Sequence, residues 1–340
     1  MAVELSRGWH NWDPRYLKLA YLALGVGAVA YPFLANTYWI DVANFFGIYV
    51  LLGLSLNIIV GYVGLFNLGQ AAFYAVGAYS TAILNTAFHI PVLWLLPLSG
   101  LLAALMGYLI SRPILHLRGD YLCIVTIGFG EIMRITLNNN PFGLTGGPNG
   151  IMGIARPEIL GFRLFQPHHY YYFIWLIVLL TVIALKRLEN SRIGRAWHYI
   201  REDELAAAAM GIDVNRMKLL AFMLGAGLAG VAGNIYATKM TVIAPESFSF
   251  WESVVMFTIV VLGGPGSIPG VVVGTLCMVV LPELFREFAK ARMLVFGLAM
   301  ILMMIFRPEG LWPARRYREE IRSAKEELPA GQKPETLSGA

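Results

Sequence analysis

Long uncharged stretches dominate the pattern of hydrophobic and polar positions along the chain. Residues 42–111 contain no Lys, Arg, Asp or Glu, and residues 253–282 contain none either. A soluble domain of this size has too much surface to bury all of those side chains. Lipid tails solvate such side chains directly, and α-helices satisfy their own backbone hydrogen bonds. The pattern therefore predicts an all-α integral membrane protein, folded as a polytopic helical bundle.

The apolar segments predict about ten membrane-spanning helices, within a range of eight to ten. A full crossing needs ~20 residues, so the last three predicted spans are short. The glycines and prolines between the eighth and ninth spans indicate either a tight turn or the middle of a discontinuous helix. The predicted spans are Tyr16–Ala35, Val42–Val60, Gln70–Phe88, Pro91–Ile110, Tyr121–Leu137, Tyr170–Leu185, Met217–Thr238, Trp251–Leu262, Gly270–Leu284 and Met293–Phe306.

Basic residues gather in the connections between spans and predict the orientation. The positive-inside rule places the groups at 112–118, 186–201 and 315–318 in the cytoplasm, with an even number of spans between them. Both termini are then predicted to be cytoplasmic. Only the basic residues at 286–292 fit the rule poorly, because the predicted topology places them outside. The net charge of +5 is explained by these connections, so nucleic acid is not a predicted partner. The chain divides into a cytoplasmic N-terminus (1–15), a transmembrane domain (16–313) with a cytoplasmic segment (186–216), and a polar cytoplasmic tail (314–340).

Two glycine-rich segments lie at comparable places in the two halves of the chain, 61–70 and 262–270. Broken helices at membrane depth survive only where they line a cavity or are buried in protein. Paired interruptions indicate an internal pseudo-repeat with a substrate path at its interface, whereas the alternative is that both segments are surface loops. The candidate pathway residues are Gly64, Asn67, Gly69, Gln70, Gly263, Gly264, Gly266 and Ser267.

A few polar or small residues inside the predicted spans have more than one interpretation. Glu131 and Arg134 lie three residues apart on one helix face, and an intramembrane ion pair is either functional or a structural pair near the outer helix end. The structural interpretation is favoured because the span ends just after them. Glu252 is interpreted as a marker of the membrane edge. Small residues four apart, such as Gly225 and Gly233 around Ala229, predict close helix packing, most simply within the subunit.

The polar segment from Ser191 to Asp213 is the most informative part of the chain. Strong helix formers from Asp203 to Met210, followed by Gly211, predict a short helix with a glycine after its C-terminus. A short exposed helix between two spans suits the groove of a partner protein, although an ordinary amphipathic connector has the same pattern.

Motifs for chemistry are absent from the sequence. There is no Gly-x4-Gly-Lys-[Ser/Thr] phosphate loop, no His-Glu-x-x-His, no Gly-x-Ser-x-Gly and no Cys/His metal cluster, and Cys123 and Cys277 both lie in apolar stretches. The chain is therefore predicted to be no enzyme and to bind no metal or cofactor. If transport is driven by ATP, then ATP and its Mg²⁺ must bind to other subunits.

Several long passages resemble the LivM-type permease subunits of bacterial branched-chain amino acid ABC importers. The similarity runs from about the second span to Pro313, and the motifs occur in order. They are GYVGLFNLGQAAFYAVGAY (61–79), LRGDYLCIVTIGFGEIMRI (117–135), LTGGPNGI (144–151), GRAWHYIREDELAAAAMGIDVNRMK (194–218), APESFSFWE (244–252) with IVVLGGPGSIPG (259–270), and RPEGLWP (307–313).

The resemblance implies a multi-pass subunit of the bacterial inner membrane that imports leucine, isoleucine and valine. Its implied partners are a second, LivH-type permease, two cytoplasmic ABC ATPases, a periplasmic amino-acid-binding protein and the membrane lipid. The resemblance also implies that segment 194–211 couples to the ATPases; its Glu204, Ala206, Ala207 and Gly211 echo a Glu-Ala-Ala-x3-Gly loop with the glycine one place later. The implied coupling residues are Gly194, Arg195, Arg201, Glu202, Asp203, Glu204, Ala207 and Gly211.

The sequence is also compatible with three other interpretations. An ABC permease for urea or short amides has a similar sequence. An ion-coupled secondary transporter needs ionisable groups deep in the spans, and only Glu131 and Arg134 come near that description. A membrane-embedded enzyme needs a nucleophile or metal constellation, which the sequence does not show.

Overall fold

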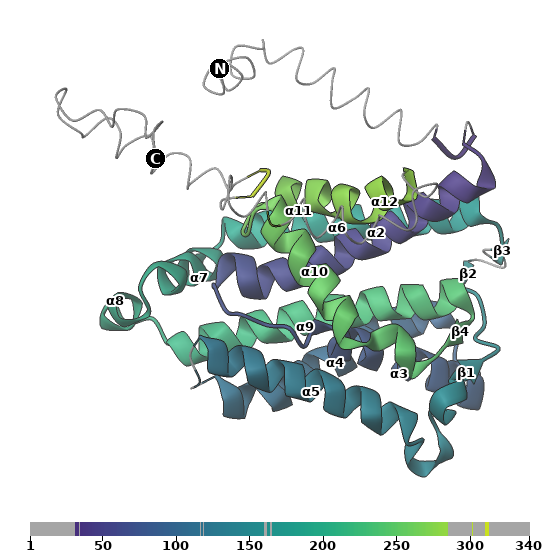
Figure 1. Ribbon diagram of the computed structural model, residues 1–340, viewed down its shortest axis with the longest axis horizontal. Coiled ribbons are helices and arrows are strands. Elements are labelled where there is room, and N and C mark those ends of the chain that lie inside the picture. Colours follow the sequence, from purple (N-terminus) through teal and green to yellow (C-terminus); the bar gives the residue numbers. More distant parts are fainter. Residues whose placement is uncertain are drawn as a thin grey trace, which may run out of the picture.

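The computed structural model describes residues 31–33, 35–115, 117, 119–159, 162–163, 165–284, 301 and 310–312, and it is mostly helical (Figure 1). The predicted N-terminal segment, the tail after residue 313 and most of the first and last predicted spans lie outside the described residues. The long helices are α2 (Thr37–Asn57, continued by a π-helix at Ile58–Tyr62), α3 (Gln70–Phe88), α4 (Val92–Ile114), α5 (Asp120–Asn138), α6 (Pro167–Glu189) and α9 (Val214–Met240). The shorter ones are α7 (Arg192–Glu202), α8 (Glu204–Ala209), α10 (Phe250–Gly263), α11 (Ile268–Thr275, continued by a π-helix at Leu276–Val280) and α12 (Leu281–Leu284).

Every predicted span between Val42 and Leu284 overlaps one of these helices. Within the described residues, five helical segments are long and apolar enough to cross a membrane on their own: Thr37–Tyr62, Val92–Ile114, Pro167–Glu189, Val214–Met240 and Pro245–Gly263. Residues 268–284 form a shorter apolar helical run. The prediction of a helical membrane protein is thus confirmed at this coarser level, and the count of about ten stays a prediction.

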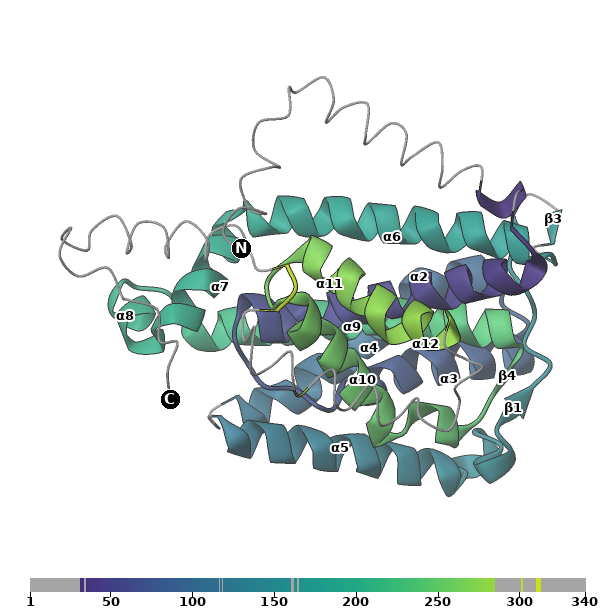
Figure 2. The same ribbon diagram turned by 45° about the horizontal axis from the view of Figure 1, so that its top comes forward.

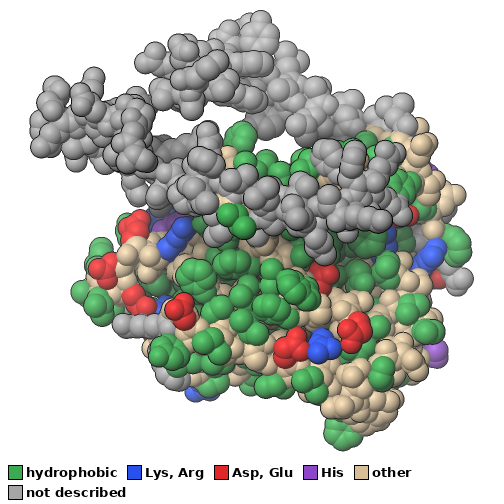
Figure 3. Space-filling view, viewed as in Figure 1, with side chains coloured by type: hydrophobic (Ala, Val, Ile, Leu, Met, Phe, Trp, Pro, Cys, Tyr) green, Lys and Arg blue, Asp and Glu red, His purple; other side chains and the backbone are tan. Residues whose placement is uncertain are grey.

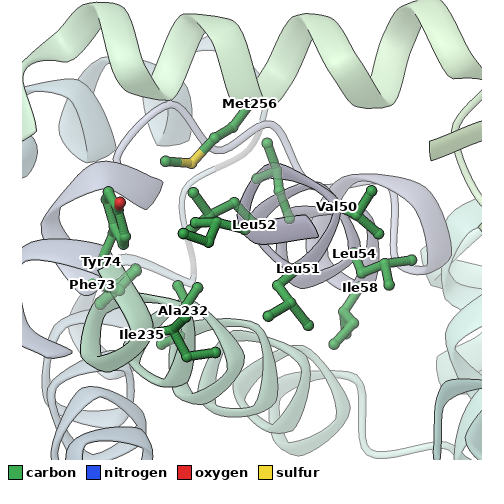
Figure 4. Packing of buried hydrophobic residues seen from close by; sticks show 14 of the residues in the cluster. Val50, Leu51, Leu52, Leu54, Ile58, Phe73, Tyr74, Ala232, Ile235 and Met256 are labelled. Carbon is green, nitrogen blue, oxygen red and sulfur yellow. The ribbon is translucent and has the colours of Figure 1, made fainter. Parts of the chain in front are cut away.

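Helix α9 lies at the centre of the bundle and packs against α2, α3 and α4 (Figures 1 and 2). Small residues permit this close approach: a Cβ on Gly77 of α3 would overlap the carbonyl group of Gly230 in α9. A Cβ on Gly225 would lie 2.8 Å from the Ile59 side chain. The small face predicted on α9 therefore packs inside the subunit, as the simpler interpretation holds. Figure 4 shows the surrounding apolar cluster, which includes Leu51, Leu52, Phe73, Tyr74, Ala232, Ile235 and Met256.

Short strands close one end of the bundle, opposite α7 and α8 (Figure 1). Strand β1 (Ile151–Met152) pairs antiparallel with β4 (Val242–Ile243), and β2 (Glu158–Ile159) pairs antiparallel with β3 (Phe162–Arg163). The short strands and the predicted cytoplasmic segment (186–216) thus lie at opposite ends of the bundle.

Apolar side chains spread over the surface as well as the core (Figure 3). On α5, for example, Tyr121 is 73% exposed and Ile132 is 63% exposed. Exposure of these apolar side chains to water would cost free energy, whereas lipid or a second membrane subunit would cover them favourably.

Candidate functional site

The predicted cytoplasmic segment forms two short helices, α7 and α8, where the sequence predicted one. Helix α7 begins after Ser191, whose Oγ accepts a hydrogen bond from the Gly194 amide (3.3 Å). Helix α8 begins after Asp203, whose carboxylate accepts hydrogen bonds from the amides of Leu205 (2.8 Å) and Ala206 (3.0 Å). Serine and aspartate are favoured at this position because they satisfy amides that have no helical partner. Gly211 follows α8 with a φ of +84°, the left-handed conformation that often ends a helix.

Helix α7 is anchored to the membrane helices by one buried aromatic ring. Trp197 is fully buried, and its Nε1 donates a hydrogen bond to the Met217 carbonyl at the start of α9 (2.8 Å). Its ring stacks on Tyr62, with centroids 6.4 Å apart and planes at 12°. Gly194 is also buried, and a Cβ there would overlap the carbonyl groups at the end of α6. Helix α7 is therefore packed directly against the end of α6, the start of α9 and the π-helix that continues α2.

Helix α8 is anchored by an ion pair of unequal burial. The Nζ of Lys218, in α9, lies 2.7 Å from Oε2 of Glu204, and the Lys218 side chain is only 3% exposed whereas that of Glu204 is 31% exposed. Ala207 of the same helix is also buried. The rest of α8 faces outward, and Leu205 and Met210 are 71% and 70% exposed. Exposed apolar side chains on a polar helix at the end of the bundle indicate a surface that a partner covers.

The predicted coupling residues thus divide into two sets. Arg195, Glu202, Asp203 and Gly211 lie exposed on α7, α8 or the turns beside them. Gly194, Ala207 and Glu204 face inward and hold the two helices in place.

Arg201 connects the coupling segment to both glycine-rich segments. Its guanidinium donates a hydrogen bond to the Gly61 carbonyl, and a Cβ on Gly266 would lie 3.1 Å from the same guanidinium. The two glycine segments also touch each other, because a Cβ on Gly61 would overlap the Gly266 amide nitrogen. Oδ1 of Asn57, at the end of α2, accepts a hydrogen bond from the same Gly266 amide (2.8 Å). The structure therefore brings the two predicted interruptions together, at the end of the bundle that carries α7.

The first interruption is a non-helical segment, residues 63–69, that precedes α3. Asn67 and Gln70 are fully buried. Nδ2 of Asn67 donates to Oε1 of Gln70 (2.9 Å), and Nε2 of Gln70 donates to Oγ of Ser55 in α2 (2.9 Å). Gly69 passes so close to α5 that a Cβ would overlap the Thr126 carbonyl. Non-helical backbone is tolerated here because protein groups satisfy it; Gly64, by contrast, is exposed, with a φ of +79°.

The second interruption is a tight turn, so the discontinuous-helix alternative is wrong. Helices α10 and α11 form an antiparallel hairpin: a Cβ on Gly263 would overlap the Gly270 carbonyl. Gly264 and Gly266 have φ values of +113° and +86°, which favour glycine. Oγ of Ser267 accepts a hydrogen bond from the Gly270 amide (3.1 Å) and begins α11.

The predicted intramembrane pair is part of a three-residue cluster. Nε of Arg134 donates to Oε2 of Glu131 (3.0 Å), and Nη1 of Arg134 lies 3.2 Å from Oε1 of Glu246. Glu246 is 74% exposed and belongs to the 3₁₀ turn Pro245–Phe248. The cluster joins the last turns of α5 to the start of α10, and this exposure supports the structural interpretation.

Sequence reasoning missed a cavity at the start of α10. It has a volume of about 200 Å³ and is bordered by Phe45 and Tyr49 of α2, Tyr74 of α3, Tyr236 of α9 and Glu252 of α10. The Tyr49 hydroxyl donates a hydrogen bond to Oε2 of Glu252 (3.0 Å). Glu252 therefore faces a partly enclosed cavity, and no sequence signal separates this position from a membrane edge. Across the residues that the structure describes, no group of His, Cys, Asp and Glu is arranged to hold a metal ion.

Apolar spans, paired helix breaks and a polar helix pair at one end define a class of protein, the membrane-embedded subunit of a transporter. Residues 38–305 match the family described as "Branched-chain amino acid transport system / permease component", and the chain belongs to this family. It is 42% identical over 331 residues to the high-affinity branched-chain amino acid transport system permease protein LivM of Salmonella typhimurium (strain LT2), covering 91% of this chain and 78% of that one.

Two further relatives extend the comparison. The LivM protein of Escherichia coli (strain K12) is 42% identical over 329 residues, which cover 90% of this chain and 77% of the relative. The LivH permease of the same organism is 28% identical over 288 residues, which cover 77% and 90% of the two chains. No solved structure matches this chain. The chain is a transport permease component and not an enzyme.

Proposed function

We propose that this chain is the transmembrane permease subunit of an ATP-driven importer that moves leucine, isoleucine and valine into the cytoplasm. The relatives that are 42% identical over about nine-tenths of the chain bear names that specify high-affinity branched-chain amino acid transport. This degree of similarity favours branched-chain amino acids over urea or short amides as the cargo. The predicted ionisable pair gives no support to an ion-coupled mechanism, because Arg134 is held between Glu131 and Glu246 near the end of α5.

The proposed assembly contains a second, LivH-type permease, two cytoplasmic ABC ATPases that bind ATP and Mg²⁺, and a periplasmic binding protein. Detectable similarity to LivH permeases supports a pair of related membrane subunits. The assembly lies in the bacterial inner membrane, and this chain crosses it about ten times (eight to ten) with both termini in the cytoplasm. Segment 186–216 is the coupling segment of the transmembrane domain 16–313.

The single observation that carries the coupling role is the position of α7 and α8. They protrude from one end of the bundle, expose Leu205 and Met210, and contact both glycine-rich segments through Arg201. In the proposed mechanism, closure of the ATPase pair moves α8, and α7 passes the movement to segment 63–69 and to the α10–α11 turn. The pathway residues Gly64, Asn67, Gly69, Gln70, Gly263, Gly264, Gly266 and Ser267 then change their packing together.

A pair of matched double variants tests the docking surface. Leu205→Glu with Met210→Glu places one charge on α8 and one on the residue that follows it, and we expect the ATPases to dissociate because apolar contacts are replaced by buried charge. The control, Leu144→Glu with Met152→Glu, changes the same residue types at exposed positions at the other end of the bundle. The measurement is co-purification of the ATPases with each tagged permease. Equal recovery with both variants contradicts the coupling role of α8.

The cargo is tested separately with the wild-type assembly in vesicles. We expect uptake of leucine, isoleucine and valine that requires both the binding protein and ATP. Uptake of urea or acetamide in preference to leucine contradicts the proposed cargo, and uptake without the ATPases contradicts the proposed energy source.

A further inference from the structure

The cavity between α2, α3, α9 and α10 contains a carboxyl group without a cationic partner. Within the described part of the chain, no Lys or Arg forms an ion pair with Glu252, and its hydrogen bond from Tyr49 uses one carboxylate oxygen. The N-terminus of α10 offers only a partial positive charge, which is less than a full counter-ion provides. Acidic groups at such positions in membrane proteins face cavities and mark the paths of substrates or ions.

Three hydroxyl groups around the same cavity also make no hydrogen bond with a described residue. Tyr74 is only 3% exposed, yet its hydroxyl makes no hydrogen bond with any residue that the structure describes. The same holds, over those residues, for the hydroxyls of Tyr236 and Ser247, which border the cavity from α9 and from the 3₁₀ turn before α10. Tyr74 is buried, whereas Tyr236 and Ser247 are only partly buried. Since buried polar groups are normally satisfied, the Tyr74 hydroxyl in particular favours a polar occupant of the cavity.

The chemistry of the walls specifies that occupant. A carboxylate without a cation binds an ammonium group, and hydroxyl groups donate hydrogen bonds to a carboxylate. Phe45 and Ile48 supply apolar surface beside them. A volume of about 200 Å³ is smaller than the pockets of ~300–1,000 Å³ that hold drug-sized ligands, and it suits a single small molecule. A small zwitterion with an apolar side chain meets all of these conditions.

The cavity also adjoins the first glycine-rich segment. Ser253 follows Glu252 in α10, and its Oγ accepts a hydrogen bond from the Ala71 amide in the first turn of α3 (3.0 Å). Segment 63–69 leads from this point to Gly61, whose carbonyl accepts the hydrogen bond from Arg201. Glu252, which borders the cavity, is thus the neighbour in sequence of Ser253, which holds the start of α3. This contact lies at one end of segment 63–69, and the contact with Arg201 of α7 lies at the other end.

We propose that this cavity is a transient binding site for the amino acid zwitterion inside the permease, with Glu252 binding the ammonium group and the hydroxyls of Tyr74, Tyr236 and Ser247 binding the carboxylate. The site rests on the proposed function, because it assumes that an amino acid passes through this chain. It adds a selection step within the membrane: the site distinguishes zwitterions from simple anions and amines.

Thiol protection tests the site directly in the purified complex of this chain with its permease partner and ATPases, without the binding protein. Ser247→Cys is introduced after Cys123 and Cys277 are replaced by serine, and the modification rate with a small methanethiosulfonate amine is measured. We expect millimolar leucine to slow modification at residue 247 several-fold. Met152→Cys, exposed at the same end of the bundle, is the control and should react at one rate with and without leucine.

Analogues of leucine identify the chemistry of the protection. Leucine should protect, whereas 4-methylpentanoate, which lacks the ammonium group, should not, and adding Glu252→Gln should abolish protection by leucine. Equal protection by 4-methylpentanoate, no protection by leucine, or equal protection by sodium chloride each overturns the proposal; the last result points to a cation site. These readouts need no transport, so they separate failure of the site from failure of the proposed function.

Leucine uptake by the full assembly is the second measurement of the proposed site. It tests the site even if the cysteine at position 247 is not modified at all. Glu252→Gln should lower leucine uptake by about tenfold, the effect of losing one charge-assisted hydrogen bond, while assembly and the ATPase stimulation by the binding protein are retained. Glu246→Gln, an exposed carboxyl from the neighbouring turn, is the control and should leave uptake within about twofold. Unchanged uptake by Glu252→Gln overturns the proposal.

Discussion

The ion pair between Glu204 and Lys218 leads to an asymmetric prediction. Breaking a buried pair by removing one partner costs about 3–5 kcal/mol, because the other charge stays in a poor environment. Lys218 is 3% exposed, so Glu204→Gln leaves a buried ammonium group without its ion pair. Since Glu204 is 31% exposed, water screens part of the interaction, and we expect a cost of about 2 kcal/mol. Lys218→Met leaves only the more hydrated carboxylate and should cost less than about 1 kcal/mol.

Hydrogen exchange measures this cost locally. The cost of about 2 kcal/mol applies to the docking of α8 on α9, and it corresponds to a shift of roughly 30-fold in that equilibrium. In the purified assembly, the amides from 205 to 210 should exchange faster by about this factor in Glu204→Gln and by less than about fivefold in Lys218→Met. Amides in the middle of α9 serve as the internal control and should not change.

The two single variants are expected to have unequal effects on the docking of α8. If Lys218→Met loosens α8 as much as Glu204→Gln does, the burial of the lysine is not the source of the cost. The double variant should be no worse than Glu204→Gln alone, because it removes the stranded charge. A double variant that exchanges faster than both single variants refutes the account.

Two more predictions concern helix packing and coupling. Gly77→Ala should destabilise the protein by about 1–3 kcal/mol, because its Cβ would overlap the backbone of Gly230, whereas Gly128→Ala, with no atom within 4 Å of its Cβ, should leave the thermal unfolding midpoint in detergent unchanged. Equal midpoints for both variants contradict the tight contact between α3 and α9. Arg201→Ala removes the hydrogen bond to the Gly61 carbonyl, so leucine uptake per ATP hydrolysed should fall several-fold while ATP hydrolysis continues; an unchanged ratio contradicts the proposed link.

The sequence predicted the positions of the helices from Val42 to Leu284 because each is a sustained apolar run between polar or glycine-rich segments. It also predicted α8, since strong helix formers between Asp203 and Gly211 act locally. The sequence did not predict α7 as a separate helix. This helix is held by Trp197 and by the packing of Gly194, which are tertiary contacts.

Contacts between distant segments account for the rest of what the sequence did not show. The choice between a tight turn and a discontinuous helix at 263–270 depended on whether α11 packs back on α10. The role of Arg201 depended on Gly61 and Gly266 meeting, and the position of Glu252 depended on Tyr49, which is 203 residues away. Periodicity and composition describe one segment at a time, so they contain no signal for such contacts.

The central claim is that this permease takes its driving force from separate ATPases through α7 and α8. The most direct measurement is leucine accumulation in vesicles that contain this chain and its permease partner, supplied with loaded binding protein, with and without the ATPases and ATP. We predict accumulation against the gradient only when both ATPases and ATP are present, and its loss when residues 201–211 are deleted. Accumulation by the permease chains alone, or an ATP-driven rate that survives the deletion, contradicts the account.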